Sequence, residues 1–215
     1  MKTYQPYVDF TAQGLTVRAL LTLYSKLEDQ DDPTEIELLP FVVFMAFSIE
    51  AYLNSVGARS ISYWDELERL PWKSKMSILH QHVGKVPSWG SGPLQFCSQV
   101  FKIRDKLAHG KPERVTGPVC VSPADAYTYI KGADSSLEPD WYKGLTKEWV
   151  MSAKAKHQEL MEYISSLYGL GKQEHLRVST GSIMEVPGGI SGPAGRDAGA
   201  SDPTVRSSQE GREWR

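Results

Sequence analysis

A long apolar run in the first quarter of the chain places the strongest constraint on the fold. From Ile36 to Val56, large apolar residues recur on nearly every side of a helix. Thr34, just before the run, is a favoured residue at a helix N-terminus. A helix that is apolar all round must be buried among other elements. The run therefore predicts a central helix that ends at Gly57, with the rest of the chain packed around it.

The composition predicts one domain in a reducing compartment. With 215 residues and 40% hydrophobic content, the chain can bury one ordinary core. Its two cysteines, Cys97 and Cys120, form no CxxC pair and are too few for a disulfide framework. The most apolar stretch, 38–52, is shorter than a membrane-spanning helix, and the N-terminus lacks the apolar run of a signal peptide. We therefore expect a cytoplasmic protein without a membrane segment.

Apolar residues at helical spacing predict further helices around the central one. The predicted helices cover residues 15–27, 62–70, 72–82, 93–108 and 146–168. Pro71 separates the second from the third, and Pro93 is a good first-turn residue for the fourth. Between Val115 and Tyr129, β-branched and turn residues favour a small irregular or two-stranded insertion. The expected fold is an all-α bundle of about five helices, counting the central one and taking 62–82 as one broken helix.

The composition changes after Gly171, where glycine, serine and proline replace large apolar residues. Such a segment cannot bury enough apolar surface to hold one structure. We therefore expect a helical domain at residues 1–171 and a disordered low-complexity tail at 172–215. Six basic residues in this tail are balanced by six acidic ones, so it is not a basic RNA-binding arm.

One segment near the middle of the chain concentrates charge. The whole chain has a formal net charge of -2, which excludes a global attraction to nucleic acid. Between 102 and 114, however, five basic residues accompany only two acidic ones. Candidate phosphate or RNA contacts here are Lys102, Lys106 and Lys111. A solvated basic helix end is the simpler interpretation of such a cluster.

Arg104, Asp105 and His109 form the best candidate for chemistry in this segment. Asp105 and His109 are four residues apart and share a helix face, so the carboxylate can hold the imidazole in one tautomer. Arg104 and His109 lie about 140° apart around the helix axis, so they diverge on a single helix. Two copies of the helix related by a twofold axis can bring both residue types around one cleft.

Two further polar residues lie within the apolar run. Glu50 and Asn54 are four apart on the predicted central helix, and buried polar groups need partners. They serve either as a helix-to-helix hydrogen bond or an exposed stripe, or as supporting residues for the active-site helix. Metal binding is not expected, because His80 and His82 are two apart and point to different faces. No cofactor motif occurs either.

Two sequence motifs resemble those of a known family. RDKLAHGK, which contains Arg104 to Lys111, together with the earlier FSIEAYLN, is similar to the HEPN superfamily. That group is all-helical and forms dimers, and the resemblance spans roughly residues 15–168 by motif order. In the family, an arginine and a histidine separated by four to six residues form a metal-independent ribonuclease site at the dimer interface. A polar residue often follows the arginine directly.

The resemblance implies a homodimeric endoribonuclease in which Arg104, Asp105 and His109 are catalytic. His109 would act as general base or acid on the RNA 2′-hydroxyl or the leaving oxygen, which yields a 2′,3′-cyclic phosphate. Arg104 can hold a phosphate bidentately. A toxin–antitoxin or phage-defence role, with an antitoxin protein as partner, would follow. Two alternatives remain: a non-catalytic module that binds nucleotide, RNA or a protein, and a structural helical dimer without ligand.

Overall fold

The computed structural model describes residues 3–131 and 137–186, and this part of the chain is mostly helical, as expected. The longer helices are α1 (Ala12–Glu28), α2 (Glu35–Ser60), α4 (Trp72–His82), α5 (Gly92–Ala108) and α8 (Lys147–Leu167). Shorter ones are α3 (Trp64–Leu67), α6 (Pro123–Lys131), α7 (Asp140–Lys143) and the 3-10 turn η1 (Glu174–Leu176). A two-stranded sheet pairs β1 (Thr3–Phe10) with β2 (Ser179–Val186). The strands were not predicted.

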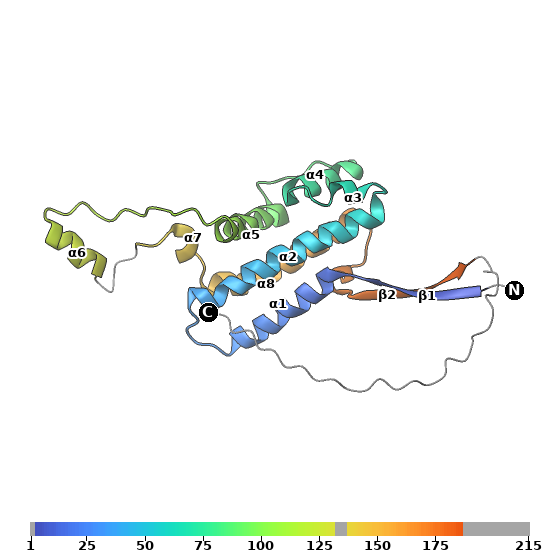
Figure 1. Ribbon diagram of the computed structural model, residues 1–215, viewed down its shortest axis with the longest axis horizontal. Helices are drawn as coiled ribbons and strands as arrows, with labels where there is room; N and C mark the ends of the chain where they lie inside the picture. The colour runs from blue at the N-terminus through green and yellow to red at the C-terminus, as the bar shows by residue number, and fades with distance from the viewer. Residues whose placement is uncertain (1–2, 132–136, 187–215) are drawn as a thin grey trace, which may run out of the picture. The chain divides into compact units, whose positions relative to one another are not determined.

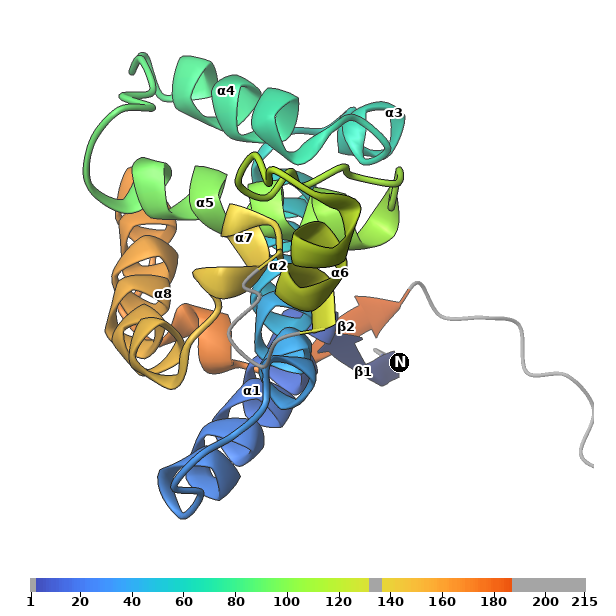
Figure 2. The ribbon, with the colours of Figure 1, turned by 90° about the vertical axis from the view of Figure 1, so that its left-hand side faces the viewer.

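Helix α2 is the central element, as the apolar run predicted. It packs against α1, α4, α5 and α8, and Figure 1 shows it crossing in front of α8. Figure 2 shows α4 and α5 on one side of it and α1 on the other. Its fully buried side chains are Leu38, Phe41, Val42, Met45, Ile49, Tyr52, Leu53 and Val56. At its start, Thr34 and Glu37 form a capping box, in which the Thr34 backbone N–H donates to a Glu37 carboxylate oxygen at 2.8 Å.

Gly57 does not end α2, contrary to the sequence prediction. The helix continues to Ser60, and the glycine instead makes room for the buried ring of Trp64. A Cβ atom at position 57 would lie within 2.1 Å of that ring. The missing side chain therefore serves helix packing rather than helix termination.

Helix α2 is long enough to cross a membrane. The helix has 26 residues and contains an 18-residue window apolar enough to cross a membrane. Length alone therefore does not exclude a membrane span, contrary to the expectation from residues 38–52. Half of this window is buried inside the protein, against the four other long helices, as in the core helix of a soluble bundle.

The segment predicted as an irregular or two-stranded insertion contains helix α6. Residues 110–120 have no regular structure, but Pro123–Lys131 is helical. The reason lies in the preceding turn: Ser122 Oγ accepts a hydrogen bond from the Asp125 N–H at 3.2 Å and donates to the Asp125 carboxylate at 2.7 Å. This reciprocal cap starts a helix that buries none of its residues.

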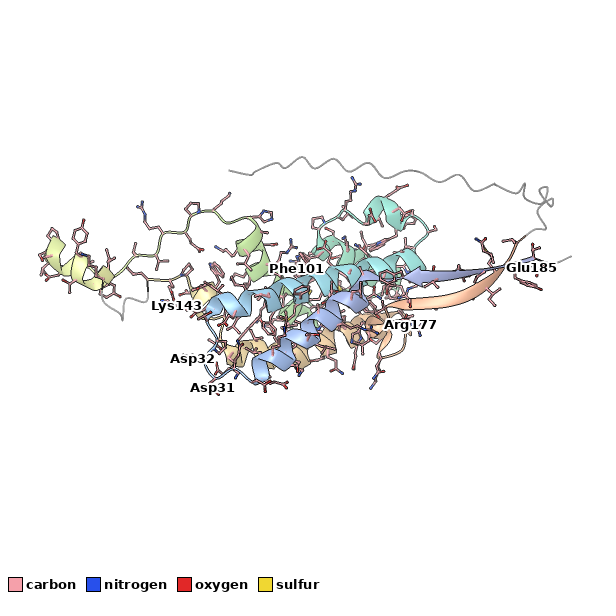
Figure 3. All side chains as sticks on the ribbon, turned by 60° about the horizontal axis from the view of Figure 1, so that its bottom comes forward. Asp31, Asp32, Phe101, Lys143, Arg177 and Glu185 are labelled. Carbon is pink, nitrogen blue, oxygen red and sulfur yellow. The ribbon has the colours of Figure 1, made fainter. Side chains whose placement is uncertain are left out.

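The predicted boundary at Gly171 is wrong for residues 172–186, because η1 and β2 follow it. His175 is 4% exposed, and Arg59 donates to the Glu174 carboxylate at 2.6 Å. The Thr11 N–H donates to the Val178 carbonyl at 2.7 Å, just beyond Arg177, which Figure 3 labels at the start of this strand. The rest of the predicted disordered tail, 187–215, lies outside the described residues.

Two compact units divide the described chain. Residues 8–181 contain all of the helices and the whole candidate site. The other unit contains residues 3–7 and 182–186, where the Thr3 hydroxyl donates to the Val186 carbonyl at 3.0 Å.

Candidate active site

Helix α5 positions the three predicted catalytic residues at its C-terminal end. Its apolar face is buried through Leu94, Phe96, Cys97, Val100 and Phe101, and its opposite face is left to polar side chains. His109 is the C-cap, and its backbone N–H donates to the Asp105 carbonyl at 2.9 Å. The predicted bounds of this helix are therefore confirmed to within one residue.

Arg104 belongs to a chain of alternating charges that joins three helices. Its Nη2 lies 4.0 Å from Glu50 Oε2 on α2, and the other oxygen of Glu50 accepts from Lys75 Nζ on α4 at 3.2 Å. The Lys75 side chain is only 2% exposed, whereas that of Glu50 is 34% exposed. Glu50 therefore neutralises a buried lysine on one side and anchors Arg104 on the other. These are helix-to-helix contacts, and one of them holds Glu50 against Arg104.

The guanidinium of Arg104 retains unused hydrogen-bonding capacity. Its Nε lies 3.3 Å from Oδ1 of Asp105, but the geometry is not that of a hydrogen bond, and this buried nitrogen has no partner. The guanidinium carbon is 5.0 Å from the ring centre of Phe101, which Figure 3 labels on α5. The side chain is a quarter exposed. A planar donor group is thus held by a ring and two carboxylates, and its exposed part, not the buried Nε, can meet an acceptor such as a phosphate oxygen.

A cationic cavity lies at the C-terminal end of α5, and Arg104 is not among its lining residues. Its volume is about 340 Å³, and its lining residues are Lys102, Asp105, Lys106, His109 and Lys111. Five of the eight residues proposed from the sequence therefore line one cavity. In the described part of the chain, the His109 imidazole makes no hydrogen bond, so it is free to meet a ligand. The predicted support of His109 by Asp105 is not made, because the Asp105 carboxylate is turned toward Arg104 instead.

The chain that follows α5 is tied back to it through Glu113. Lys106 Nζ donates to Glu113 at 2.9 Å, and the Trp141 indole donates to the same carboxylate at 3.1 Å. The hydrogen bond from Lys106, followed by that from Trp141, lowers the pKa of Glu113 below its usual range. Glu113 therefore holds the segment after α5 against Lys106 and offsets the positive charge of that lysine, whereas Lys102 and Lys111 have no such partner in the described residues.

The remaining predicted residue, Asn54, does not join the cationic cavity. It lines a second cavity of about 590 Å³ with residues of α1, α2 and the C-terminal segment. Its Oδ1 atom is buried and accepts no hydrogen bond. Spacing on α2 placed Glu50 and Asn54 on one face, but only Glu50 reaches Arg104.

Sequence reasoning missed Lys75, the buried member of the charge chain. The available signal was its position on α4: it lies three residues after Trp72, which is partly buried, and four before the buried Leu79, so it falls on the apolar face of an amphipathic helix. A lysine in such a position needs a carboxylate partner.

Comparison with known protein families, with curated proteins and with solved structures finds no match for this chain.

Proposed function

We propose that this chain is a HEPN-like, metal-independent endoribonuclease that acts in the cytoplasm as a homodimer, with an antitoxin protein as a further partner. The observation that carries the proposal is the juxtaposition at the end of α5. A cavity lined by three lysines, a histidine and Asp105 lies at the end of the helix that carries Arg104, whose guanidinium is 3.3 Å from the Asp105 carboxylate and one-quarter exposed. The four longer helices around α2 suit the bundle that the sequence motifs imply.

The arrangement suits cleavage of RNA by its own 2′-hydroxyl. The His109 imidazole accepts the 2′-hydroxyl proton, the 2′ oxygen bonds to phosphorus, and the bond to the 5′ oxygen breaks. The departing 5′ oxygen takes a proton from the His109 of a second copy, acting as general acid. The products are a 2′,3′-cyclic phosphate and a 5′-hydroxyl, without a metal or cofactor.

Arg104 and the lysines supply the charge that this reaction needs. A guanidinium can donate two parallel hydrogen bonds to the non-bridging phosphate oxygens, where negative charge increases in the transition state. Lys102, Lys106 and Lys111 line the cavity and attract the backbone of the RNA. Glu50 and Lys75 act through Arg104 and are positioning residues.

A non-catalytic module that binds RNA, nucleotide or protein is the second candidate function. It is favoured by the absence, in the described part of a single chain, of any contact between the Arg104 and His109 side chains. Binding needs only the cationic cavity, whereas cleavage needs both residue types around one phosphate.

A single-turnover assay on a mixed RNA pool with EDTA present distinguishes the two functions. The wild-type chain should cleave RNA and leave cyclic phosphate ends. His109→Ala should lower the rate by about 10² to 10⁴, the usual contribution of general acid–base catalysis, while RNA affinity is retained. His82→Ala is the matched control, because this exposed histidine lies on α4 and stacks on Tyr168. Absence of cleavage by the wild type, or full cleavage by His109→Ala, would exclude the enzyme and leave the binding module.

A further inference from the structure

The second cavity, which shares no lining residue with the cationic one, lies where three segments far apart in the sequence meet. Its volume is about 590 Å³, and all of its lining residues belong to the unit that contains the helices. Its walls come from residues 9–13, from α2 and from residues 174–180. The side chains of Thr11 and Gln13 both donate to the Arg177 carbonyl, at 2.6 and 3.4 Å, and so hold the first and third walls together. A cavity of this size with fixed walls suits a small molecule.

Two amide side chains in these walls have oxygen atoms without a hydrogen bond. Asn54 Oδ1 is buried and has no partner. Gln13 is 1% exposed, and its side-chain oxygen accepts no hydrogen bond from the part of the chain that the structure describes. A buried acceptor without a donor is unfavourable, because it has lost its water and gained nothing in exchange. The walls therefore favour a ligand that brings N–H or O–H donors.

Two opposite charges line the same cavity without forming an ion pair with each other. The Asp9 carboxylate makes no ion pair or hydrogen bond within the described residues. Arg177, labelled in Figure 3, is half exposed and has only long contacts, 3.5 Å from Glu174 Oε2 and 3.4 Å from Thr180 Oγ1. The other arginine in the walls, Arg59, donates to Glu174 and back to its own helix. Asp9 and Arg177 are therefore the carboxylate and the guanidinium left for a ligand.

Four further residues give the cavity an apolar part. Ala12, Ala51 and Ala58 have small side chains, so the chain itself does not fill the space in front of them. The Phe10 ring lines the same cavity and is 65% exposed rather than packed in the core. An aliphatic or aromatic group of a ligand can therefore be buried against these residues.

We propose that this cavity binds a free amino acid with an apolar side chain. The ammonium group has three N–H donors, which suit the Asp9 carboxylate and the unpaired oxygens of Asn54 and Gln13. The carboxylate matches the planar guanidinium of Arg177. A zwitterion also agrees with the walls as a whole, whose two arginines and two carboxylates cancel. The inference does not rest on the proposed ribonuclease activity, because no residue of the cationic cavity takes part.

Calorimetric titration of the full chain with L-leucine or L-phenylalanine tests the ligand class. One molecule should bind per chain, with a dissociation constant of about 1 mM or below. Two analogues of leucine, 3-methylbutylamine without the carboxylate and 4-methylpentanoate without the ammonium group, should each bind about tenfold more weakly or worse. No binding of either amino acid at about 10 mM, or equal affinities for leucine and one of the analogues, would overturn the proposal.

Substitutions test whether the amino acid binds in this cavity. Asp9→Asn and Arg177→Gln should each weaken leucine binding by about tenfold or more. The matched controls, Asp65→Asn and Arg69→Gln at exposed positions on and beside α3, should not change it. Asn54→Leu should also weaken binding without lowering the melting temperature of the free protein, because it removes an acceptor that has no partner. Far-UV circular dichroism checks the fold of each variant. Leucine binding equal to that of the wild type in all three cavity variants would mean that the amino acid binds elsewhere and would sink the proposal.

Discussion

Lys75 Nζ lies 3.2 Å from Glu50 Oε1, and the lysine side chain is almost completely buried while its carboxylate partner is one-third exposed. The pair joins α4 to α2, and Glu50 then reaches Arg104 on α5. A buried ammonium is tolerated only with a counter-ion, so the carboxylate has a structural role besides positioning Arg104.

Glu50→Gln should therefore lower the free energy of unfolding. We expect a loss of about 2 kcal/mol, below the range for fully buried pairs because Glu50 is partly solvated. Adding Lys75→Met should recover most of the loss, because the uncompensated charge is removed. Urea unfolding measures both effects, and Glu159→Gln on the exposed face of α8 is the control. An unchanged stability in Glu50→Gln would show that the buried ammonium finds another partner.

Arg104→Lys should impair RNA cleavage although it preserves the charge. An ammonium cannot donate two parallel hydrogen bonds to a phosphate or stack on the Phe101 ring as a guanidinium does. The loss of one charge-assisted hydrogen bond corresponds to a decrease of about 10- to 100-fold in rate. Asp105→Asn should have the mildest effect among the three catalytic positions. Single-turnover rates of RNA cleavage measure these effects, and Arg18→Lys on α1 is the control. If Arg104→Lys cleaved RNA as fast as the wild type, Arg104 would have no role in the reaction.

Removing the C-terminal segment 172–186 should destabilise the helical unit. A chain ending after Gly171 loses the buried His175, the Arg59–Glu174 ion pair and the Val178 carbonyl that accepts from Thr11. We expect a loss of about 2 kcal/mol, or roughly 4–8 °C in melting temperature for a chain of this size. A chain ending after Val186 keeps all these contacts and is the matched control. Equal melting temperatures for the two truncations would mean that the segment contributes nothing.

Much of the helical core could be predicted from the sequence because its signals are local. Pro93 and Gly110 bracket α5, and the apolar run fixed α2 as the central helix. The change in composition after Gly171 did not predict η1 and β2, because these elements are held by residues far away in the chain. Thr11 bonds to Val178 and Thr3 to Val186, and no periodicity within either segment indicates such a pairing.

The candidate site was predicted in part for the same reason. Spacing on α5 predicted that Arg104 and His109 diverge; His109 is the C-cap of α5 and lines the cationic cavity, whose lining does not include Arg104. The prediction that Asp105 contacts His109 was wrong, because the Asp105 carboxylate lies against the neighbouring Arg104 rather than the imidazole. Lys75 was missed because a lysine on an amphipathic helix is ordinarily solvated, and only the packing of α4 on α2 buries it.

Acidification should destabilise the fold through a buried histidine that has no part in the proposed chemistry. His157 is 5% exposed on α8, and its Nε2 lies 2.8 Å from Ser48 Oγ on α2. Burial, with a smaller contribution from nearby His175, lowers the pKa of His157 to about 3. The neutral form is therefore favoured in the folded protein, whereas the unfolded chain binds a proton below its ordinary pKa of about 6.5.

The sign of the pH effect follows from this difference. Between pH 6.5 and 3 the unfolded state binds more protons, so stability decreases as the pH falls. From pH 7 to pH 5 the expected loss from His157 is about 2 kcal/mol, and His175, whose pKa is also lowered by burial, adds to it. His157→Gln can keep a hydrogen bond to Ser48 without titrating, so its unfolding free energy should change less over this range. Urea unfolding at pH 7, 6 and 5 measures the slope, with His82→Gln as an exposed control. Parallel slopes for wild type and His157→Gln would show that His157 does not remain neutral in the fold.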